Sequence, residues 1–434
     1  LLRFPPPPRL WSIFGPVIVA CLLVLGFFAL PWSSSHSQAT LQKAADSLSP
    51  RVFKNSSIKV AAMQDKKKNY IPFFGSSELN RMDRYHPAVM AARYHNYTPF
   101  LFGSRGTQSL PQLFNMTMMA PEMKNGKAVY IISPQWFVKE GVMPSAFKYY
   151  NGTYANLTWL KQANPDSPYD RYTAKRLVKL LGTEGSVANY AKKIADGKHL
   201  SSWDRTRIDM ESTLLKHEDE LFSGWFLKDN YNDRIKPRIN ELPKTYNYSA
   251  LTKEAISDAK HSSNNNRFGI LNQFYDRRVK GHLKGVPGSQ KHYSYLKSPE
   301  YADLEVVLNQ FKKTNTNVVF MITPVNAKWE KMTGLSMPMY YQAANKIKYQ
   351  LRSQGFNNIV DYSHDGGKPG FMEDTIHIGW AGWVNFDHRI APFLEQKQPQ
   401  PHYHMNKAFL SQKWQNLDPT TANLNQFTKD HLNK

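Results

Sequence analysis

Residues 71–83 have the sequence IPFFGSSELNRMD, in which an apolar run stops at Gly75, Ser76 and Ser77 and a helix-forming segment begins. This order predicts a strand, a tight turn and a helix N-terminus, and glycine permits a close turn because it has no Cβ. The unpaired N–H groups of such a helix N-terminus, beside Ser77, would stabilise an anion. Taken alone, the same residues also fit an ordinary serine N-cap with Glu78 in the first turn.

The composition indicates a folded protein with a strongly positive charge. Of the 434 residues, 41% are hydrophobic and 13% are aromatic, which favours a packed core over disorder. The net charge of +22 predicts a polyanionic partner, such as nucleic acid, an anionic membrane surface or an anionic wall polymer. Cys21 is the only cysteine, so this sequence cannot form an internal disulfide.

An uncharged apolar run covers residues 10–30 and is long enough to cross a bilayer core of about 30 Å. We predict an N-terminal transmembrane anchor over residues 1–32, with a cleaved signal peptide as the alternative, and a stalk or lead-in helix at 33–57. Arg3 and Arg9 precede the run, so the positive-inside rule predicts a single-pass cell-membrane protein whose large C-terminal part is extracellular. That location argues against nucleic acid as the partner.

Strand-like and helix-like segments alternate over much of the remaining chain. Strands are predicted at 70–74, 98–102, 127–132, 317–322 and 356–362. This alternation is typical of βαβ units and predicts an α/β domain with a parallel five-stranded sheet over residues 58–434. It lapses between about 140 and 290, where the pattern predicts a helical insertion. One helix is predicted at 78–94, and a polar tail is predicted after residue 394.

Three residues at the two ends of this frame carry the predicted chemistry. Ser77 follows the first strand, and Asp374 and His377 lie on a loop after the fifth. Ligands of parallel α/β sheets bind beyond the carboxyl ends of the strands. A serine hydroxyl needs a base to take its proton, and the base works best when a carboxylate orients it. We therefore predict that Ser77 is a nucleophile, His377 its base and Asp374 the orienting group. A capping aspartate and a packed histidine would also explain the Asp-x-x-His pattern.

An acyl-transfer site also needs hydrogen-bond donors for an oxyanion. The backbone N–H groups of Ser77 and of Gly103, which follows the second strand, are candidates, and a side-chain donor is expected after the third strand. The sequence has no G-x-S-x-G, no Walker-type loop, no G-x-G-x-x-G after the first strand and no H-E-x-x-H. These absences argue against a nucleophile-elbow hydrolase, an NTPase, a dinucleotide enzyme and a zinc protease.

These motifs resemble known families. The Gly-x-Ser after the first strand, the glycine after the second and the C-terminal Asp-x-x-His are similar to the blocks of the SGNH (GDSL-like) hydrolase superfamily, which has a flavodoxin-like fold. More narrowly, the chain resembles the DltD family over essentially its whole length. The segments that carry this resemblance are FGSSEL at 74–79, RMD at 81–83, GTQSL at 106–110, SPQWF at 133–137, PVNAKW at 324–329 and DTIH at 374–377.

The resemblance implies roles for further residues. It places Gly103 at the oxyanion-hole glycine of the superfamily. Gln135 stands near the position of a superfamily asparagine, so it would supply the third oxyanion donor. Asn326 and Arg81 are candidates for contact with the substrate, and neither a cofactor nor a metal ion is expected.

The resemblance also implies a function. DltD proteins belong to the system that adds D-alanyl esters to lipoteichoic acid on the outer face of the membrane of Gram-positive bacteria. The expected activity is Ser-His-Asp acyl transfer of D-alanyl groups to the polyglycerol-phosphate chain. The expected partners are lipoteichoic acid, the cell membrane, the membrane O-acyltransferase DltB and the D-alanyl carrier protein DltC, the ultimate donor. Two alternatives stay open: a thioesterase or esterase that hydrolyses misplaced acyl groups, and a non-catalytic cationic scaffold that binds teichoic acid and membrane partners.

Overall fold

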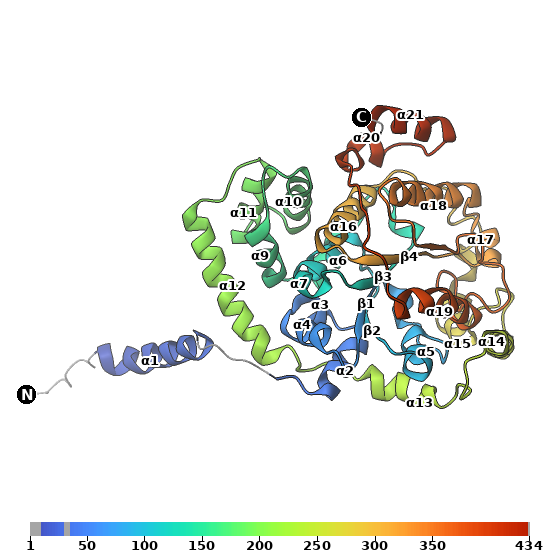
Figure 1. The fold of residues 1–434 in the computed structure, drawn as a ribbon, viewed down its shortest axis with the longest axis horizontal. Coiled ribbons are helices and arrows are strands. Elements are labelled where there is room, and N and C mark those ends of the chain that lie inside the picture. Colours follow the sequence, from blue (N-terminus) through green and yellow to red (C-terminus); the bar gives the residue numbers. More distant parts are fainter. Residues whose placement is uncertain (1–9, 30–34, 433–434) are drawn as a thin grey trace, which may run out of the picture.

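The computed structural model of the protein describes residues 10–29 and 35–432. In this part of the chain, a parallel sheet has the strand order β2-β1-β3-β4-β5 (Figure 1). The strands are β1 (Tyr70–Phe74), β2 (Thr98–Phe102), β3 (Lys127–Ile132), β4 (Asn317–Ile322) and β5 (Ile359–Asp361). This is the flavodoxin-like order, in which the succession of strands reverses between β1 and β3. The predicted α/β class and the parallel five-stranded sheet are confirmed.

Helices cover both faces of the sheet (Figure 1). The strands are continuous apolar runs because both of their faces are buried. Phe74 and Tyr130 point into one core cluster, whereas their neighbours Phe73 and Val129 point into the other. The first cluster packs against α6 (Ser109–Thr117), α16 (Glu300–Thr314) and α18 (Met337–Arg352), and the second against α5 (Pro87–Tyr94), α14 (Tyr248–Ser262) and α19 (Trp380–Glu395).

Between β3 and α16, the described chain contains helices and turns but no strand. The longer helices before α14 are α8 (Pro144–Tyr150), α9 (Thr153–Gln162), α10 (Pro168–Leu181), α11 (Ser186–Ala195) and α12 (Ser202–Phe222). The buried residues of α9, α10 and α11 belong to the first core cluster, whereas those of α14 belong to the second. The helical segment therefore contributes to both sides of the sheet, and α14 brings part of it close to α19 (Figure 1).

The single helix predicted at 78–94 is wrong. The structure has a short 3-10 helix, η1 (Ser77–Asn80), then a loop, and then α5. Pro87 starts α5, and a residue before proline is disfavoured in the helical conformation, so the chain cannot run through this point as one helix. His86 caps α5 by accepting a hydrogen bond from the N–H of Ala88 at 3.2 Å.

The segment after α19, for which the sequence predicted only a polar tail, is folded. It contains η6 (Lys407–Leu410), α20 (Gln412–Gln415) and α21 (Thr421–His431). Phe409, Trp414 and Phe427 bury their rings in the first core cluster. These three rings, with partly buried neighbours such as Tyr403 and Leu424, anchor a segment whose other residues are mostly polar.

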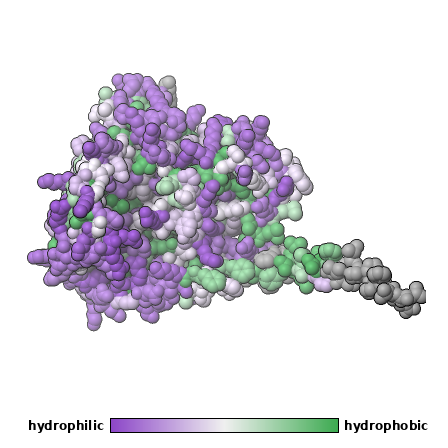
Figure 2. Space-filling model, turned by 180° about the vertical axis from the view of Figure 1, so that it is seen from behind, coloured by the Kyte–Doolittle hydropathy of each residue, from purple (hydrophilic) through white to green (hydrophobic). Residues whose placement is uncertain are grey.

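The N-terminal part of the chain contains α1 (Leu10–Ala29), at the position of the predicted anchor. No helix among the described residues is both long enough and apolar enough to cross a membrane, so the transmembrane anchor is not confirmed. Arg3 and Arg9, on which the predicted orientation depends, lie outside the described residues. The space-filling view shows that the apolar surface of α1 stands out against a largely hydrophilic body (Figure 2).

The segment predicted as a stalk or lead-in helix at 33–57 forms α2 (Gln38–Asp46) and α3 (Pro50–Lys54) within the described residues. Leu41 of α2 and Phe53 of α3 are buried in the first core cluster. These two helices are therefore packed against the domain that carries the sheet.

A buried ion pair joins α10 to α16. Arg176 donates from Nε to Oδ1 of Asp303 at 2.8 Å and from Nη2 to Oδ2 at 2.7 Å. The Asp303 side chain is fully buried, and it also accepts a hydrogen bond from the hydroxyl of Tyr172 at 2.7 Å. A carboxylate held in this environment depends on its cation, because an unpaired charge in the interior is costly.

This ion pair generates a stability prediction. Arg176→Met is expected to lower the free energy of unfolding by about 3–5 kcal/mol, because it leaves the Asp303 carboxylate buried without its partner. Lys175→Met, at the exposed neighbouring position, is the matched control and is expected to change stability by less than about 0.5 kcal/mol. Urea denaturation followed by circular dichroism measures both variants. Equal unfolding midpoints for the two would contradict the structural role given to the pair.

Candidate active site

The turn after β1 brings Ser77 to the carboxyl edge of the sheet, at the point where the strand order reverses between β1 and β3. Gly75 is required in this turn, since a Cβ there would lie 2.4 Å from Oε1 of Glu78. The same Glu78 oxygen accepts a hydrogen bond from the N–H of Ser76 at 2.5 Å. The glycine thus makes room for the side chain that holds the turn in shape.

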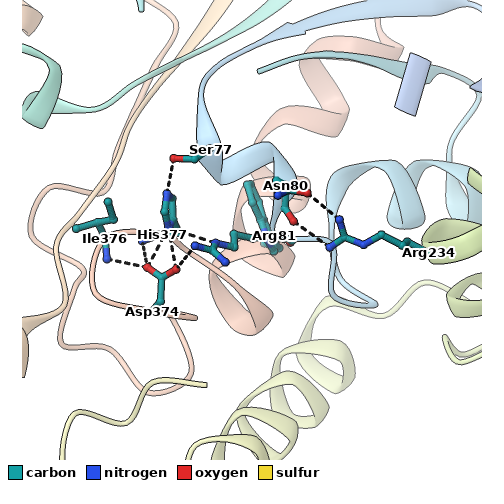
Figure 3. Close-up of polar contacts among 8 residues, drawn as sticks. Ser77, Asn80, Arg81, Arg234, Asp374, Ile376 and His377 are labelled. Carbon is teal, nitrogen blue, oxygen red and sulfur yellow. Dashed lines mark hydrogen bonds and ion pairs between the residues drawn. The ribbon is translucent and has the colours of Figure 1, made fainter. Parts of the chain in front are cut away.

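Ser77, His377 and Asp374 lie in line and are joined by hydrogen bonds (Figure 3). Oγ of Ser77 is 2.7 Å from Nε2 of His377, and Nδ1 of His377 is 2.8 Å from Oδ2 of Asp374. An ionised carboxylate can accept a hydrogen bond but cannot donate one, so Nδ1 of a neutral His377 must carry the proton. Nε2 then presents its lone pair to the hydroxyl of Ser77. The structure therefore brings together the three residues predicted as a catalytic triad.

The carboxyl group of Asp374 is buried but surrounded by donors. Oδ1 accepts from the N–H groups of Ile376 and His377, each at 2.9 Å, and Oδ2 pairs with Nη2 of Arg81 at 2.8 Å. Burial alone would raise the pKa of Asp374, but His377, Arg81 and the N–H of Ile376 outweigh it and lower the pKa to about 2. This carboxyl group is therefore ionised at neutral pH.

Arg81, predicted to contact the substrate, is an internal partner of the triad in the structure. Nη2 of Arg81 is 2.8 Å from Oδ2 of Asp374. Nε of Arg81 is 3.3 Å from Nδ1 of His377, a distance that is long for a hydrogen bond. We take the carboxylate as its principal partner, since Nδ1 of a neutral His377 already carries a proton. The guanidinium also lies over the ring of Phe274, 5.4 Å from the ring centre.

The loop that carries Asp374 and His377 is closed on itself. The N–H of Glu373 donates to the carbonyl of His377 at 2.9 Å, and Met372 pairs with Ile378 in an antiparallel bridge. With only two residues between the aspartate and the histidine, this narrow loop directs both side chains toward Ser77. The Asp-x-x-His spacing alone does not determine how the two side chains point, because their orientation also depends on the bridge between Met372 and Ile378.

Asn326, the other candidate for substrate contact, follows β4 and is engaged within the chain. Its Oδ1 accepts from the N–H groups of Lys328 and Trp329, each at 3.0 Å, and caps the next helix. Its Nδ2 donates to the carbonyl of Phe268 at 3.2 Å, and its backbone N–H donates to the carbonyl of Thr375 at 3.1 Å. Asn326 thus supports the loop of the triad, and its contact with a substrate stays a prediction.

The two further oxyanion candidates lie after the strands that flank β1. Gly103 follows β2, and a Cβ there would lie 2.7 Å from the carbonyl oxygen of Ser76, so the backbone of Gly103 packs directly against the turn of Ser77. Gln135 lies in η2 (Pro134–Trp136), which follows β3, and its side chain is half-buried. Their roles as donors stay predictions.

The structure also reveals residues that support the turn and were not predicted. Gln112 donates from Nε2 to the carbonyls of Gly75 and Phe102 at 2.9 and 2.6 Å, and Thr107 donates to the carbonyl of Gly75 at 2.8 Å. Thr107 belongs to the GTQSL segment at 106–110, and Gln112 follows that segment. Their sequence position indicated a motif, but only the tertiary contact shows that they tie the β2 loop to the turn of Ser77.

A second unpredicted contact holds the loop after η1 against α19. Oδ2 of Asp83 accepts from the N–H of Trp380 at 2.6 Å, and Oδ1 accepts from the N–H of Tyr85 at 2.7 Å. The indole N–H of Trp383 donates to the carbonyl of Arg81 at 3.2 Å. These bonds fix the backbone that carries Arg81, and therefore the position of its guanidinium beside Asp374.

A cleft of about 740 Å³ opens beside Arg81. Its walls come from the loop after η1, from η3 (Tyr231–Ile235) and α13 (Lys236–Ile239), from α14 and from the loop of the triad. The charged residues that line it are Arg81, Asp83, Arg84, Arg234, Arg238, Glu241, Asp258 and Glu373. Among the described residues, no group of three or more His, Cys, Asp or Glu side chains could hold a metal ion.

The flavodoxin-like sheet and the hydrogen-bonded serine, imidazole and carboxylate at its carboxyl edge define an α/β protein of the SGNH-hydrolase type. The family model of the DltD protein matches residues 45–395. The chain is 41% identical to the protein DltD of Lacticaseibacillus rhamnosus over 412 residues, covering 94% of this chain and 96% of the relative. It is 32% identical to the protein DltD of Bacillus subtilis (strain 168) over 396 residues, covering 88% and 97%. The chain belongs to the DltD family.

The pKa of Asp374 generates a prediction about pH. Its folded-state value of about 2 lies below its unfolded value of 3.8, so the folded protein binds fewer protons at this group. The ionised group is expected to contribute about 2 kcal/mol above pH 5, and this contribution is lost as the pH falls through 4 toward 2.

Denaturation of the native protein and of Asp374→Asn at several pH values measures this contribution. The difference in stability between the two is expected to shrink as the pH falls from 5 to 3. A difference that stays constant over that range would contradict a depressed pKa at Asp374.

Proposed function

We propose that the protein transfers D-alanyl groups to lipoteichoic acid by Ser-His-Asp acyl transfer. DltD family proteins are involved in the D-alanylation of teichoic acid, and this chain belongs to that family. The observation that carries the proposed mechanism is the chain of hydrogen bonds from Ser77 through His377 to the ionised Asp374. A structural serine would not need a base held in one tautomer by a buried carboxylate.

In the first step, Oγ of Ser77 attacks the carbonyl carbon of a D-alanyl ester or thioester while Nε2 of His377 takes the hydroxyl proton. Asp374 stabilises the imidazolium that forms. The N–H groups of Ser77 and Gly103, together with Gln135, are the proposed donors to the tetrahedral oxyanion. The intermediate collapses when the bond to the leaving oxygen or sulfur breaks, and the imidazolium returns its proton to that leaving group. Ser77 then carries the D-alanyl group as an ester.

In the second step, a glycerol hydroxyl of the polymer attacks the acyl carbonyl, and His377 takes its proton. The bond to Oγ of Ser77 breaks, and the serine regains its proton from the imidazolium. Each D-alanyl ester adds an ammonium group to the polyanionic polymer. The polymer would attract this protein before the reaction, because the protein has a net charge of +22.

We also propose that the protein works at the cell membrane, where this polymer is anchored. The membrane O-acyltransferase and the D-alanyl carrier protein of the same system would supply the acyl group. Support for this location comes from α1, whose large apolar side chains are exposed (Figure 2). They are Phe14, Val17, Ile18, Val19, Leu22, Leu23, Val24, Leu25 and Phe27. An apolar surface of this extent is typical of a contact with lipid or with another membrane protein.

A serine-directed fluorophosphonate tests the nucleophile directly. The native protein is expected to form one adduct at Ser77, as measured by intact mass and peptide mapping. Ser77→Ala is expected to abolish labelling, and His377→Ala is expected to slow it by about 10²–10⁴-fold, because the general base is lost. Ser76→Ala is the matched control and should label at nearly the native rate, since Oγ of Ser76 donates to the carbonyl of Ser104 and not to the histidine.

The alternatives predict different outcomes in cells. A strain with Ser77→Ala is expected to lose D-alanyl esters from its lipoteichoic acid while the folded protein remains present. A scaffold without catalytic activity would leave the esters at their normal level, and an esterase that removes misplaced groups would leave them unchanged or increased. Base-labile D-alanine released from purified polymer measures this difference.

A further inference from the structure

Among the described residues, two arginines of the cleft beside the triad form no direct ion pair. Arg84 pairs with Asp258 at 2.8 Å, and Arg81 pairs with Asp374 at the same distance. In the described part of the chain, by contrast, Arg234 and Arg238 form no ion pair with a carboxylate. Cations that line a concave surface without counter-charges are suited to bind an anion.

Arg234 is held next to the turn of the nucleophile. Its Nη1 donates to Oδ1 of Asn80 at 2.8 Å, and its Nη2 donates to the carbonyl of Asn80 at 2.9 Å (Figure 3). Asn80 is the last residue of η1, which starts at Ser77, and three residues of 3-10 helix span about 6 Å along the axis. A guanidinium has five N–H donors, so these two bonds fix its place and leave donors for a ligand.

Arg238 adds a second cation to this position. It lies one turn further on, and its Nη1 donates to the backbone carbonyl of Arg234 at 2.5 Å. Burial, and then the charges of Arg238 and Arg81, lower the pKa of Arg234. The guanidinium groups therefore repel one another in the free protein, and an anion placed between them would relieve that repulsion.

The acids of the cleft act on this pair only at longer range, Glu373 on Arg234 and Asp83 on Arg238. Both carboxylate oxygens of Asp83 accept backbone hydrogen bonds, from the N–H groups of Tyr85 and Trp380. Burial, with the charges of Asp83 and Asp374, raises the pKa of Glu373 above its usual range, against the opposing charges of Arg81 and Arg234. In the described residues, no carboxylate of the cleft is therefore in direct contact with the guanidinium of Arg234 or Arg238.

We propose that Arg234 and Arg238 bind a phosphodiester of the acceptor polymer and so place a neighbouring glycerol hydroxyl at Ser77. This inference deepens the proposed function and rests on it. The planar guanidinium matches the oxygens of a phosphate with paired N–H donors, and the cleft of about 740 Å³ admits a phosphodiester with its glycerol units. A D-alanyl group carries an ammonium, which two arginines repel, so the subsite selects the acceptor rather than the acyl donor.

A calorimetric titration of the full chain with a soluble glycerol-phosphate oligomer tests the subsite. Arg238→Gln is the principal variant, because within the described residues the side chain of Arg238 donates only to the backbone carbonyl of Arg234, and losing this bond leaves the turn of Ser77 intact. This variant is expected to raise Kd about tenfold or more, since it removes charge-assisted hydrogen bonds to the phosphate. Arg205→Gln, on the exposed surface of α12, makes the same change in net charge and is expected to leave Kd within about twofold.

Two results would overturn the subsite: equal affinity of the native protein and Arg238→Gln, or no binding of the oligomer by the native protein. A phosphatidylglycerol headgroup offers the same phosphodiester chemistry, so vesicles of that lipid form the second arm. Binding of the soluble oligomer without vesicles is expected, and binding to vesicles alone would contradict an acceptor subsite.

Labelling of Ser77 by fluorophosphonate separates this inference from the proposed function. Arg238→Gln is expected to label at the native rate, because Arg238 does not touch the triad, and to raise KM for the acceptor without changing the rate of acylation. A labelled Ser77 with an unchanged KM would reject the subsite and leave the proposed function standing. An unlabelled native protein would reject the proposed function. The titration with the oligomer does not depend on labelling, so it would still test the subsite.

Discussion

A negative charge on Asp374 has to be kept in the interior of the protein, and much of the site is arranged around that requirement. Burial favours the neutral acid, which would orient and stabilise the imidazole poorly. The structure opposes burial with two backbone N–H groups of the same loop, with the imidazole of His377 and with the guanidinium of Arg81. Each of these donors is in turn held by other contacts, so the charge of one carboxylate links several elements of the fold.

Arg81 is the clearest case of this linkage. Its guanidinium pairs with Oδ2 of Asp374, the same oxygen that accepts from Nδ1 of His377, and its backbone is fixed by a bond that reaches across to α19. The loop that carries Arg81 follows directly on η1, so Ser77 and the group that stabilises the acid are placed by one continuous segment. Arg234 then fastens the end of η1 to the helical segment between β3 and α16. The charge of Arg81 is used inside the triad, whereas Arg234 and Arg238 face the cleft.

The sheet was predictable because buried parallel strands are continuous apolar runs that need no partner to be recognised. The bounds of β1 to β4 agree with the sequence prediction, and only the edge strand β5 is shorter than expected. That Ser77, Asp374 and His377 lie together could be predicted because the turn after β1 and the loop after β5 are at one edge of the sheet.

Other features depend on tertiary contacts that leave no local pattern. Asn326 resembled a substrate contact, but its side chain caps a helix and supports a neighbouring loop. Arg234 and Arg238 lie in a segment rich in lysine and arginine. The composition of this segment indicates that it is charged, but it does not indicate what it contacts. Their relation to Ser77 arises because α13 and α14 pack beside the loop after η1, and no periodicity in the sequence specifies that placement.

The proposed mechanism requires that Ser77 carries the acyl group during the reaction. Tandem mass spectrometry can detect that group on the protein isolated from D-alanylating cells depleted of lipoteichoic acid, because the second step then lacks its acceptor. A D-alanyl ester is expected on the peptide that contains Ser77, and none is expected on the Ser77→Ala protein. A D-alanyl ester on another residue, or a Ser77 peptide that stays unmodified while the acyl donor is plentiful, would rule out Ser77 as the carrier.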